Sequence, residues 1–324
     1  MSRTIKIVAA MAATALALTG CSRDSGEEAA AKEYKIGITQ IATHPALDAA
    51  VEGFKQGLTD RGFANVTYDL QNAQGDTATV ASIAQKFANE ELDLILGVAT
   101  PTSQAVVKAE KDAPIVFTAV TDPVGAGLVT DADAPGANVT GVSDMLPMEP
   151  TLDLIKQVVP SVKNLGVIYN SGEANSVFLV GKQKAAAQAA GINVVEAVAG
   201  STSEVKAAAD SLVGRVDAVS VLTDNTVVSA LESVIKVCQE NKIPLFAGDT
   251  DSVKRGAIAA YAFDYKDLGV QAGNMAADIL GGKAIKDIPV QYAEKLMLSI
   301  NEGAATATGI TLPAELTAKA DNKF

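Results

Sequence analysis

Apolar and polar positions follow two alternating patterns along most of the chain. Short apolar runs are followed by longer segments in which apolar side chains recur every three or four positions. The first pair consists of a run at 35–41 and a segment at 45–61, in which Leu47, Val51 and Phe54 share one helical face. Short apolar runs are typical of buried strands and this spacing is typical of helices, so the pair predicts a βα unit.

The same pairing recurs and predicts two series of units. The further strands of the first series are 66–70, 92–99 and 114–120, with helices at 76–89 and after Pro101. The second series has helices at 148–159, 175–190, 201–214 and 226–241 and strands at 165–169, 192–198, 216–222 and 244–247. Strands that alternate with helices form parallel sheets covered by helices, so each series predicts a doubly wound α/β lobe.

The N-terminus has the pattern of a targeting segment. Two basic side chains precede an apolar run at 7–18, which ends in Leu18-Thr19-Gly20-Cys21. The run is too short for the ~20 residues of a membrane-spanning helix, and small residues precede the cysteine, as in a signal peptide. Because the pattern is similar to a bacterial lipobox, we expect residues 1–20 to be removed and Cys21 to carry a lipid. The alternative is a buried N-terminal helix with an incidental cysteine.

Composition restricts the class of partner. The chain has 26 Lys and Arg against 38 Asp and Glu, and loss of Arg3 and Lys6 with the signal makes the exported part more acidic still. This balance argues against nucleic acid as a partner. Residues 21–33 are mostly small or charged and show no apolar period, which predicts a flexible tether. No other segment offers the ~18 consecutive apolar residues of a membrane span.

Cysteine and histidine are too few for disulfide or metal chemistry. Cys238 is the only cysteine besides Cys21, so we expect no disulfide. It lies beside Val234 and Ile235 on the apolar face of an expected helix, where a cysteine is more often part of the core than a nucleophile. The single histidine, His44, excludes a multi-histidine metal site, and we expect neither a metal nor a cofactor.

Polar residues follow the strands of the first expected lobe, and ligands of open parallel sheets bind beyond the carboxyl ends of the strands. After the strand at 92–99 comes Thr100-Pro101-Thr102-Ser103, where a helix start with free N–H groups favours an anion such as a carboxylate. The strand at 114–120 ends at Thr121-Asp122, which adds a second hydroxyl. An ordinary helix cap and a simple Asp-Pro turn would explain the same residues, so both interpretations stay open.

Strand ends of the second expected lobe carry acids and amides. The strand-end strings that we expect to face the first lobe are Asn170-Ser171, Asp224-Asn225-Thr226 and Asp249-Thr250-Asp251. The candidate ligand-binding residues among them are Asn170, Ser171, Asn225 and Asp249. A carboxylate in a closed, partly dry cleft attracts a cation more strongly than it would in water, so we expect Asp249 to hold an ammonium group. A solvated turn aspartate is the alternative. Near the end of the first strand, Gln40 and His44 complete the set, with His44 either contacting the ligand or only capping a helix.

A set of short strings extends from about Tyr34 to the C-terminus. The strings are Gly37-Ile38-Thr39-Gln40-Ile41, His44-Pro45-Ala46-Leu47-Asp48, Thr121-Asp122-Pro123-Val124, Leu128-Val129, Asn138-Val139-Thr140-Gly141-Val142, Asp264-Tyr265 with Gly269, and Ile300-Asn301 before Gly309-Ile310. In their order and spacing they resemble a family of substrate-binding proteins of ABC transporters that includes tryptophan and tyrosine transport proteins. Members of this family look like type I periplasmic binding proteins, in which two lobes close on a solute and present it to a permease.

The resemblance implies how the remaining segments are placed. The strand at 257–263 and the helix at 266–280 return to the first lobe, so that lobe 1 consists of 34–147 and 257–288 and lobe 2 of 148–256 and 289–324. The chain then crosses between the lobes three times and forms a hinge. The resemblance also implies an extracytoplasmic, lipid-anchored receptor whose partners are an ABC permease and a small solute, with an aromatic amino acid favoured.

Residue chemistry agrees with an amino acid as the ligand, because hydroxyl and N–H donors face an acid across the expected hinge. The absence of Trp argues mildly against a sugar, and the aromatic side chains available for a ring are Tyr169, Phe178, Tyr261 and Phe263. A hydrolase using a serine, His44 and an aspartate is an alternative, but no Gly-x-Ser-x-Gly elbow, phosphate-binding loop or metal spacing supports an enzyme. A sensor or chemoreceptor accessory protein would use the same closure, and the sequence allows both.

Overall fold

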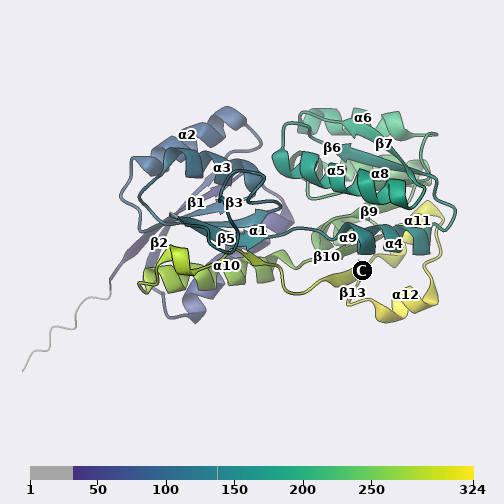
Figure 1. The fold of residues 1–324 in the computed structure, drawn as a ribbon. Coiled ribbons are helices and arrows are strands. Elements are labelled where there is room, and N and C mark those ends of the chain that lie inside the picture. The colour runs from purple at the N-terminus through teal and green to yellow at the C-terminus, as the bar shows by residue number, and fades with distance from the viewer. Residues whose placement is uncertain (1–31, 137) are drawn as a thin grey trace, which may run out of the picture. The chain divides into compact units, whose positions relative to one another are not determined.

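A computed structural model describes residues 32–136 and 138–324. Within these residues Glu33–Phe324 form one unit, in which helices cover the faces of two β-sheets (Figure 1). The expected signal peptide at 1–20, the lipidation site Cys21 and most of the tether at 21–33 lie outside the described residues.

The first sheet has six strands in the order β11-β5-β4-β3-β1-β2, and all neighbouring strands are parallel. The strands are β1 (Tyr34–Gln40), β2 (Val66–Asn72), β3 (Leu94–Val98), β4 (Ile115–Val120), β5 (Val139–Ser143) and β11 (Gln291–Tyr292). Its helices are α1 (Pro45–Asp60), α2 (Thr77–Ala88), α3 (Thr100–Ala109) and α10 (Tyr265–Leu280), with a 3₁₀ turn at Ile285–Asp287. Strands β3, β4 and β5 are buried along their whole length, as expected for strands covered on both faces.

The second sheet has seven strands in the order β13-β12-β10-β9-β8-β6-β7. They are β6 (Asn164–Tyr169), β7 (Asn193–Val198), β8 (Ala218–Val221), β9 (Leu245–Ala247), β10 (Ala259–Ala262), β12 (Met297–Ile300) and β13 (Asn322–Lys323). The helices of this half are α4 (Met148–Val158), α5 (Ala174–Ala189), α6 (Val205–Leu212), α7 (Asn225–Ser229), α8 (Leu231–Glu240), α9 (Thr250–Arg255), α11 (Glu302–Thr308) and α12 (Ala314–Lys319), with a 3₁₀ turn at Thr202–Glu204. The helix expected at 226–241 is interrupted at Ala230, which separates α7 from α8.

The two sheets share one strand order. The order β2-β1-β3-β4-β5 in the first sheet is repeated as β7-β6-β8-β9-β10 in the second. The chain passes between the sheets three times, after β5, after β10 and after β11. The prediction of two doubly wound lobes joined by three crossings is therefore confirmed. In sheets of this order ligands bind beyond the carboxyl ends of the strands, at the point where the strand order reverses.

The structure corrects the sheet assignment of two segments. The strand expected in the first lobe at 257–263 forms β10, which lies in the second sheet and pairs with β9 in parallel and with β12 in antiparallel orientation. The segment expected in the second lobe after residue 289 begins with β11, which pairs with β5 in the first sheet. An apolar run predicts a strand but not its neighbour, because pairing partners are decided by tertiary contacts. The second sheet is consequently mixed rather than fully parallel.

Helices α1 and α10 lie side by side and approach closely (Figure 1). A Cβ atom added at Gly53 of α1 would lie 2.0 Å from the carbonyl oxygen of Lys266, and one at Gly269 of α10 would lie 2.1 Å from that of Ala50. Any side chain at these positions would push the helices apart, so the glycines permit contact between the two backbones. This contact fixes the distance between the starts of the two helices.

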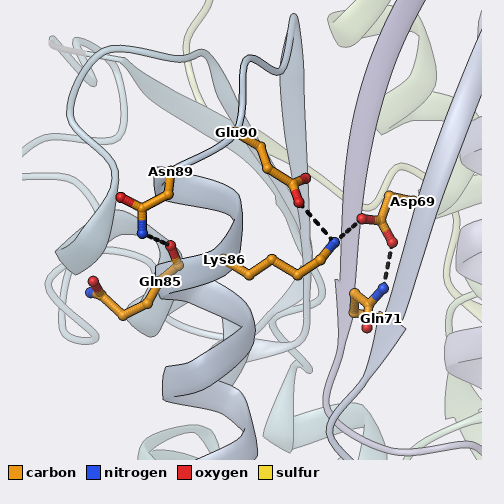
Figure 2. Close-up of polar contacts among 6 residues, drawn as sticks. All are labelled: Asp69, Gln71, Gln85, Lys86, Asn89 and Glu90. Carbon is orange, nitrogen blue, oxygen red and sulfur yellow. Dashed lines mark hydrogen bonds and ion pairs between the residues drawn. The ribbon is translucent and has the colours of Figure 1, made fainter.

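An exposed charged network joins β2 to α2 at the edge of the first sheet (Figure 2). Lys86 lies between Asp69 of β2 and Glu90, with the Lys86 Nζ to Glu90 Oε1 distance at 3.2 Å. Gln71 donates a second hydrogen bond to Asp69. Such surface pairs contribute little to stability, typically about 0–1 kcal/mol.

Candidate functional site

A cavity, here called the inner cavity, lies where strand ends of the two sheets face each other. The first lobe contributes His44, Ala46, Leu47, Ala119, Asp144 and Tyr265. The second lobe contributes Asn175, Thr223, Asp224, Asn225, Val228 and Asp249. The space in which the centre of a water-sized group can lie is about 20 Å³. That volume is close to the minimum that holds one small polar group.

Asp144 follows β5 at the first crossing between the lobes and is buried. Its carboxylate accepts hydrogen bonds from the hydroxyl of Tyr265, at 2.6 Å, and from Thr121 Oγ1, at 3.1 Å. Tyr265 is the first residue of α10, directly after the second crossing. One hydrogen bond in the inner cavity therefore links two of the three segments that connect the lobes.

The second lobe places two further buried carboxylates at helix starts. Asp224 caps α7 and also accepts hydrogen bonds from the Asn170 amide and from Ser176 Oγ, both at 2.6 Å. Asp249 caps α9 by accepting from the Ser252 amide at 2.7 Å and from Ser252 Oγ at 2.5 Å. The alternative of a solvated turn aspartate is wrong for Asp249, because only 2% of its surface is exposed.

Burial raises the pKa of all three carboxyl groups. For Asp224 the neighbouring charge of Glu173 adds to the effect of burial, and its pKa rises to about 7. Among the described residues no Lys or Arg lines the inner cavity. Arg255 lies near enough to lower the pKa of Asp249, but two hydrogen bonds of 2.8 and 2.9 Å join its guanidinium to Glu232. The inner cavity is therefore acidic and has no lysine or arginine in its lining.

Glu173 lies behind the inner cavity as a fourth buried carboxylate. Its Oε2 accepts from the backbone amide of Asn225 at 3.2 Å and from Asn225 Nδ2 at 2.5 Å. Its Oε1 accepts from the backbone amide and the hydroxyl of Thr226, at 3.0 and 2.8 Å. Glu173 thus fixes the start of α7, which carries part of the cavity wall.

His44 precedes α1, but its side chain makes no capping hydrogen bond, so the interpretation as a mere cap fails. Only 7% of its surface is exposed, and neither ring nitrogen has a hydrogen-bond partner among the described residues. Burial lowers the pKa of His44 to about 4, helped by the charge of Arg255 and opposed by the nearby amide of Asn225. The imidazole is therefore neutral at physiological pH, with one donor and one acceptor nitrogen.

Two more polar atoms of the inner cavity have no partner within the described part of the chain. They are Asn175 Oδ1 and Thr223 Oγ1. Buried polar atoms in folded proteins are nearly always hydrogen-bonded, so a group of unpartnered atoms around one cavity points to an occupant.

Backbone strain occurs beside the cavities. Ala119 in β4 has a φ of 56°, where β4 shifts its register against β5, and it lines the inner cavity. Ala99 has a φ of 76° and directly precedes α3. Non-glycine residues rarely adopt this conformation, and they are enriched where a backbone is shaped for a ligand.

A second cavity, here called the outer cavity, adjoins the first through Asn175, which lines both. Its other lining residues are Thr100, Asp122, Gly125 and Ala126 from the first lobe and Ser171, Gly172, Ala174, Val177 and Phe178 from the second. The space in which the centre of a water-sized group can lie is about 480 Å³ in this cavity. This volume lies within the usual range of small-molecule pockets. The two cavities differ in size and in polarity.

Six of the eleven expected ligand-binding residues line one of the two cavities. His44, Asn225 and Asp249 line the inner cavity, and Thr100, Asp122 and Ser171 line the outer cavity. The other five line neither cavity, and two of them donate hydrogen bonds to residues that line the inner cavity. Thr121 donates to Asp144, and Asn170 donates to Asp224.

Three expected ligand-binding residues have their hydrogen-bond donors occupied by the protein. Thr102 Oγ1 donates to the carbonyl oxygen of Val98 at 2.5 Å, and Ser103 Oγ donates to that of Ala99 at 2.8 Å. Gln40 Nε2 donates to the carbonyl oxygen of Ala42 and to the carboxylate of Asp48, both at 2.7 Å. These side chains shape the ends of the strands.

The sequence analysis missed four polar lining residues, Asp144, Asn175, Thr223 and Tyr265. Asp144 and Thr223 each follow a strand, so the rule that selected Asp249 could also have selected them. Asn175 lies in the first turn of a helix, and Tyr265 is the first residue of another. A rule based on strand ends does not select residues at these positions. Of the four aromatic side chains considered for a ring, Phe178 is the one that lines a cavity.

Cys238 is buried, and burial raises the pKa of its thiol to about 12. A thiol with so high a pKa is almost fully protonated at neutral pH and is a poor nucleophile. In the described residues no group of three His, Cys, Asp or Glu side chains is arranged to hold a metal ion. The same residues contain no helix with the length and apolar character needed to span a bilayer.

Comparison with known sequences gives a match over nearly the whole described chain. Residues 35–324 match the family described as ABC transporter substrate binding protein. A tyrosine-binding protein of Clostridioides difficile is 44% identical over 301 residues, which cover 90% of this chain and 87% of that protein.

Comparison with solved structures adds information on the arrangement of the lobes. An ABC domain of Streptococcus pneumonia in complex with L-Trp is 36% identical and has a TM-score of 0.87, with 90% of this chain and 100% of that chain covered. The ligand-free, open structure of a substrate-binding protein with adhesive properties from Clostridium difficile is 41% identical, yet its TM-score is 0.67, with coverages of 89% and 98%. Within Glu33–Phe324 the chain thus resembles the ligand-bound structure more than the open one, although its sequence is closer to the latter.

Proposed function

The chain belongs to the family of ABC transporter substrate-binding proteins, and from this premise we propose that it binds an aromatic amino acid between its two lobes. Substrate-binding proteins bind small molecules outside the cytoplasm and interact with ABC permeases, and they are not enzymes. The identity of the ligand is the new element of the proposal.

The acidity of the inner cavity carries the proposal. Asp144, Asp224 and Asp249 are each at most 2% exposed, and no lysine or arginine among the described residues lines the same space. Buried carboxylates without a neighbouring cation are energetically unfavourable. A ligand with an ammonium group balances their negative charge and therefore binds more favourably. An amino acid brings this group, whereas a neutral sugar does not.

The carboxylate of the amino acid lies at the start of α3. The first N–H groups of a helix have no partner inside the helix and favour an anion. Thr100 in this turn is 1% exposed, and its hydroxyl has no hydrogen-bond partner in residues 32–136 and 138–324. Because Thr100 lines the outer cavity and Asn175 lines both cavities, one ligand can reach the acidic cavity and this helix start together.

The side chain of the amino acid occupies the outer cavity. Its volume of about 480 Å³ accommodates a large ring, and Phe178 and Ala174 offer apolar contacts. The tyrosine-binding relative and the L-Trp complex support an aromatic side chain over an aliphatic one.

The receptor is held at the membrane through Cys21 and presents its ligand to the permease. Support comes from the lipobox-like string at residues 18–21 and from the family to which the chain belongs. Mass spectrometry of the chain purified from membranes tests the anchor, because cleavage before Cys21 with lipid attachment gives a defined mass. An unmodified chain that starts at Met1 would contradict it.

Isothermal titration calorimetry tests the ligand. The exported chain is freed of co-purified ligand by reversible unfolding and titrated with tyrosine, tryptophan, phenylalanine, leucine, glutamate and glucose. We expect binding of at least one aromatic amino acid and weaker or no binding of the other solutes. Binding of glucose or glutamate with no response to aromatic amino acids would contradict the proposal.

A further inference from the structure

The inner cavity is too small for a whole amino acid and has the size of a single head group. Its free space of about 20 Å³ is close to what one water molecule requires, and an ammonium group is of similar size. The adjoining outer cavity provides the room for the rest of a ligand. The atoms around the inner cavity therefore decide which head group fits.

The three carboxylates of the inner cavity already have protein donors. Both oxygens of Asp144 accept hydrogen bonds from side-chain hydroxyls, and both oxygens of Asp249 accept from Ser252. Asp224 accepts three hydrogen bonds, from the backbone amides of Asn170 and Val227 and from Ser176 Oγ. Their charge acts on the cavity, but their hydrogen-bonding capacity is largely used by the fold.

Three neutral side chains of the inner cavity have polar atoms without a hydrogen-bond partner among the described residues. The orientation of the Asn175 amide is set by its Nδ2, which donates to the carbonyl oxygen of Thr223 at 2.9 Å and to Glu173 at 3.3 Å. Both partners are acceptors only, so the Nδ2 must face them and Oδ1 is left as an unpartnered acceptor. Thr223 Oγ1 and the nitrogens of His44 are likewise buried, and no hydrogen-bond partner for them lies in the described part of the chain.

We propose that the ammonium group of the ligand is held directly by three neutral acceptors, Asn175 Oδ1, Thr223 Oγ1 and one ring nitrogen of His44. This assignment rests on the proposed function and makes it more specific. An ammonium group has three N–H donors and no acceptor, which matches three acceptors one to one. The surrounding carboxylates favour a cation over a water molecule, and the low pKa of His44 keeps the ring able to accept.

The proposal separates two properties of the ligand that usually vary together, its positive charge and its N–H donors. Tyrosine, N-methyltyrosine and N,N,N-trimethyltyrosine all carry the positive charge, but the number of N–H donors falls from the first to the last. We expect affinity to fall at each step, by about tenfold or more per lost donor, since hydrogen bonds to charged groups are among the stronger ones.

A pair of threonine variants tests the protein side. Thr223→Val removes the hydroxyl at constant shape and should lower the affinity for tyrosine by about tenfold or more. Thr118→Val is the matched control, because Thr118 Oγ1 is also buried and has no partner within the described residues, but Thr118 lines neither cavity. Equal affinities of wild type and Thr223→Val would overturn the assignment, as would an equal loss in both variants.

His44 allows a test that does not depend on an aromatic ligand. It is the only histidine of the chain, so ¹⁵N NMR of a tag-free protein reports its ring without ambiguity. We expect methylammonium chloride, at concentrations that leave the fold intact, to shift the acceptor nitrogen, and tetramethylammonium chloride to leave it unchanged. An unchanged signal with both salts shows that a water molecule alone fills the cavity and overturns the proposal. If methylammonium shifts the signal but no aromatic amino acid binds, the head-group site stands and only the proposed function fails.

Discussion

Carboxylates at the edge of the first sheet and carboxylates in the inner cavity respond to their surroundings in opposite ways. At the edge, partial burial would raise the pKa of Asp69, but Lys86 and Gln71 outweigh it and lower the pKa (Figure 2). In the inner cavity, burial raises the pKa of Asp224 and Asp249, and no lysine or arginine of the described residues lines the space beside them.

The difference lies in where the cation comes from. The sheet edge carries its own cation in the sequence, so its charges are balanced whether or not anything binds. In the cavity the balancing charge has to be supplied from outside, which makes charge balance depend on the ligand. We infer that the edge network is structural and that the cavity carboxylates select a cationic ligand.

Removing the ammonium group from the ligand should have the largest effect. We expect 3-(4-hydroxyphenyl)propionate, which is tyrosine without its amino group, to bind about 1,000-fold more weakly than tyrosine, because the cavity then keeps unpaired buried groups. Calorimetric titration measures the ratio. Tyramine, which keeps the amino group and lacks the carboxylate, is the control. Its affinity should fall less, relative to tyrosine, than that of the propionate. Equal affinity of the propionate and tyrosine would contradict a cation-selecting cavity.

Asp224 and Asp69 should give stability opposite dependences on pH. The pKa of Asp224 is raised in the folded protein, so its contribution is fully present below the unfolded value of 3.8 and is lost as the pH rises through about 7. Asp224→Asn should remove this loss, on the order of 1 kcal/mol for each pH unit in that window. Urea denaturation between pH 2 and 8 measures it.

The matched variant for that experiment is Asp69→Asn. The pKa of Asp69 is lowered, so its contribution is present above 3.8 and is lost as the pH falls through the folded value. The difference from wild type should therefore disappear at low pH. If the free energy of unfolding changed with pH in the same way in both variants, the carboxylates of the cavity and of the edge would not differ in their pKa shifts.

Asp249→Asn should weaken tyrosine binding by about tenfold, because it removes one buried charge that attracts the ammonium group. Asn is also a good helix cap, so the fold should persist. Asp76→Asn is the matched control: Asp76 caps α2 through the Thr79 amide at 2.6 Å, as Asp249 caps α9, but lies outside both cavities. If both variants bind tyrosine equally well, Asp249 acts only as a cap.

Lys86→Met should have the smallest effect. It removes the cation of the edge network, and exposed pairs contribute about 0–1 kcal/mol, so the midpoint of urea denaturation should shift only slightly. Tyrosine affinity should stay the same within error, because Lys86 lines neither cavity. A clear loss of affinity would mean that the edge of the sheet communicates with the ligand site.

Much of the fold could be predicted from periodicity, because buried strands and one-sided helices impose different spacings on apolar residues. Sheet membership could not. The segment at 259–262 is as apolar as the strands of the first sheet, yet its register against β9 and β12 places it in the second. The two-residue strand β11 is too short to carry any periodic signal.

Site residues were predicted in part, and the reason lies in hydrogen bonding. A rule based on strand ends selected Asp249 and Thr100, which line the cavities, but also Thr102 and Ser103. The hydroxyls of the latter two donate to nearby carbonyl groups, which no spacing rule detects. The hydroxyl of Tyr265 donates to Asp144, which lies 121 positions away in the sequence. Only the folded structure brings these two residues together.

The sequence by itself determined the two doubly wound lobes, the family and a set of polar strand ends, because these properties depend on local spacing and on short strings of residues. The tertiary structure alone decided which of the polar residues meet. Close contact of the α1 and α10 glycines holds the start of α1, next to His44, and the start of α10, at Tyr265, in a definite relation. Burial then raised the pKa values of the cavity carboxylates and left Asn175 Oδ1 and Thr223 Oγ1 without a hydrogen-bond partner among the described residues. These effects depend on distance and dielectric environment, which the order of residues along a chain does not contain.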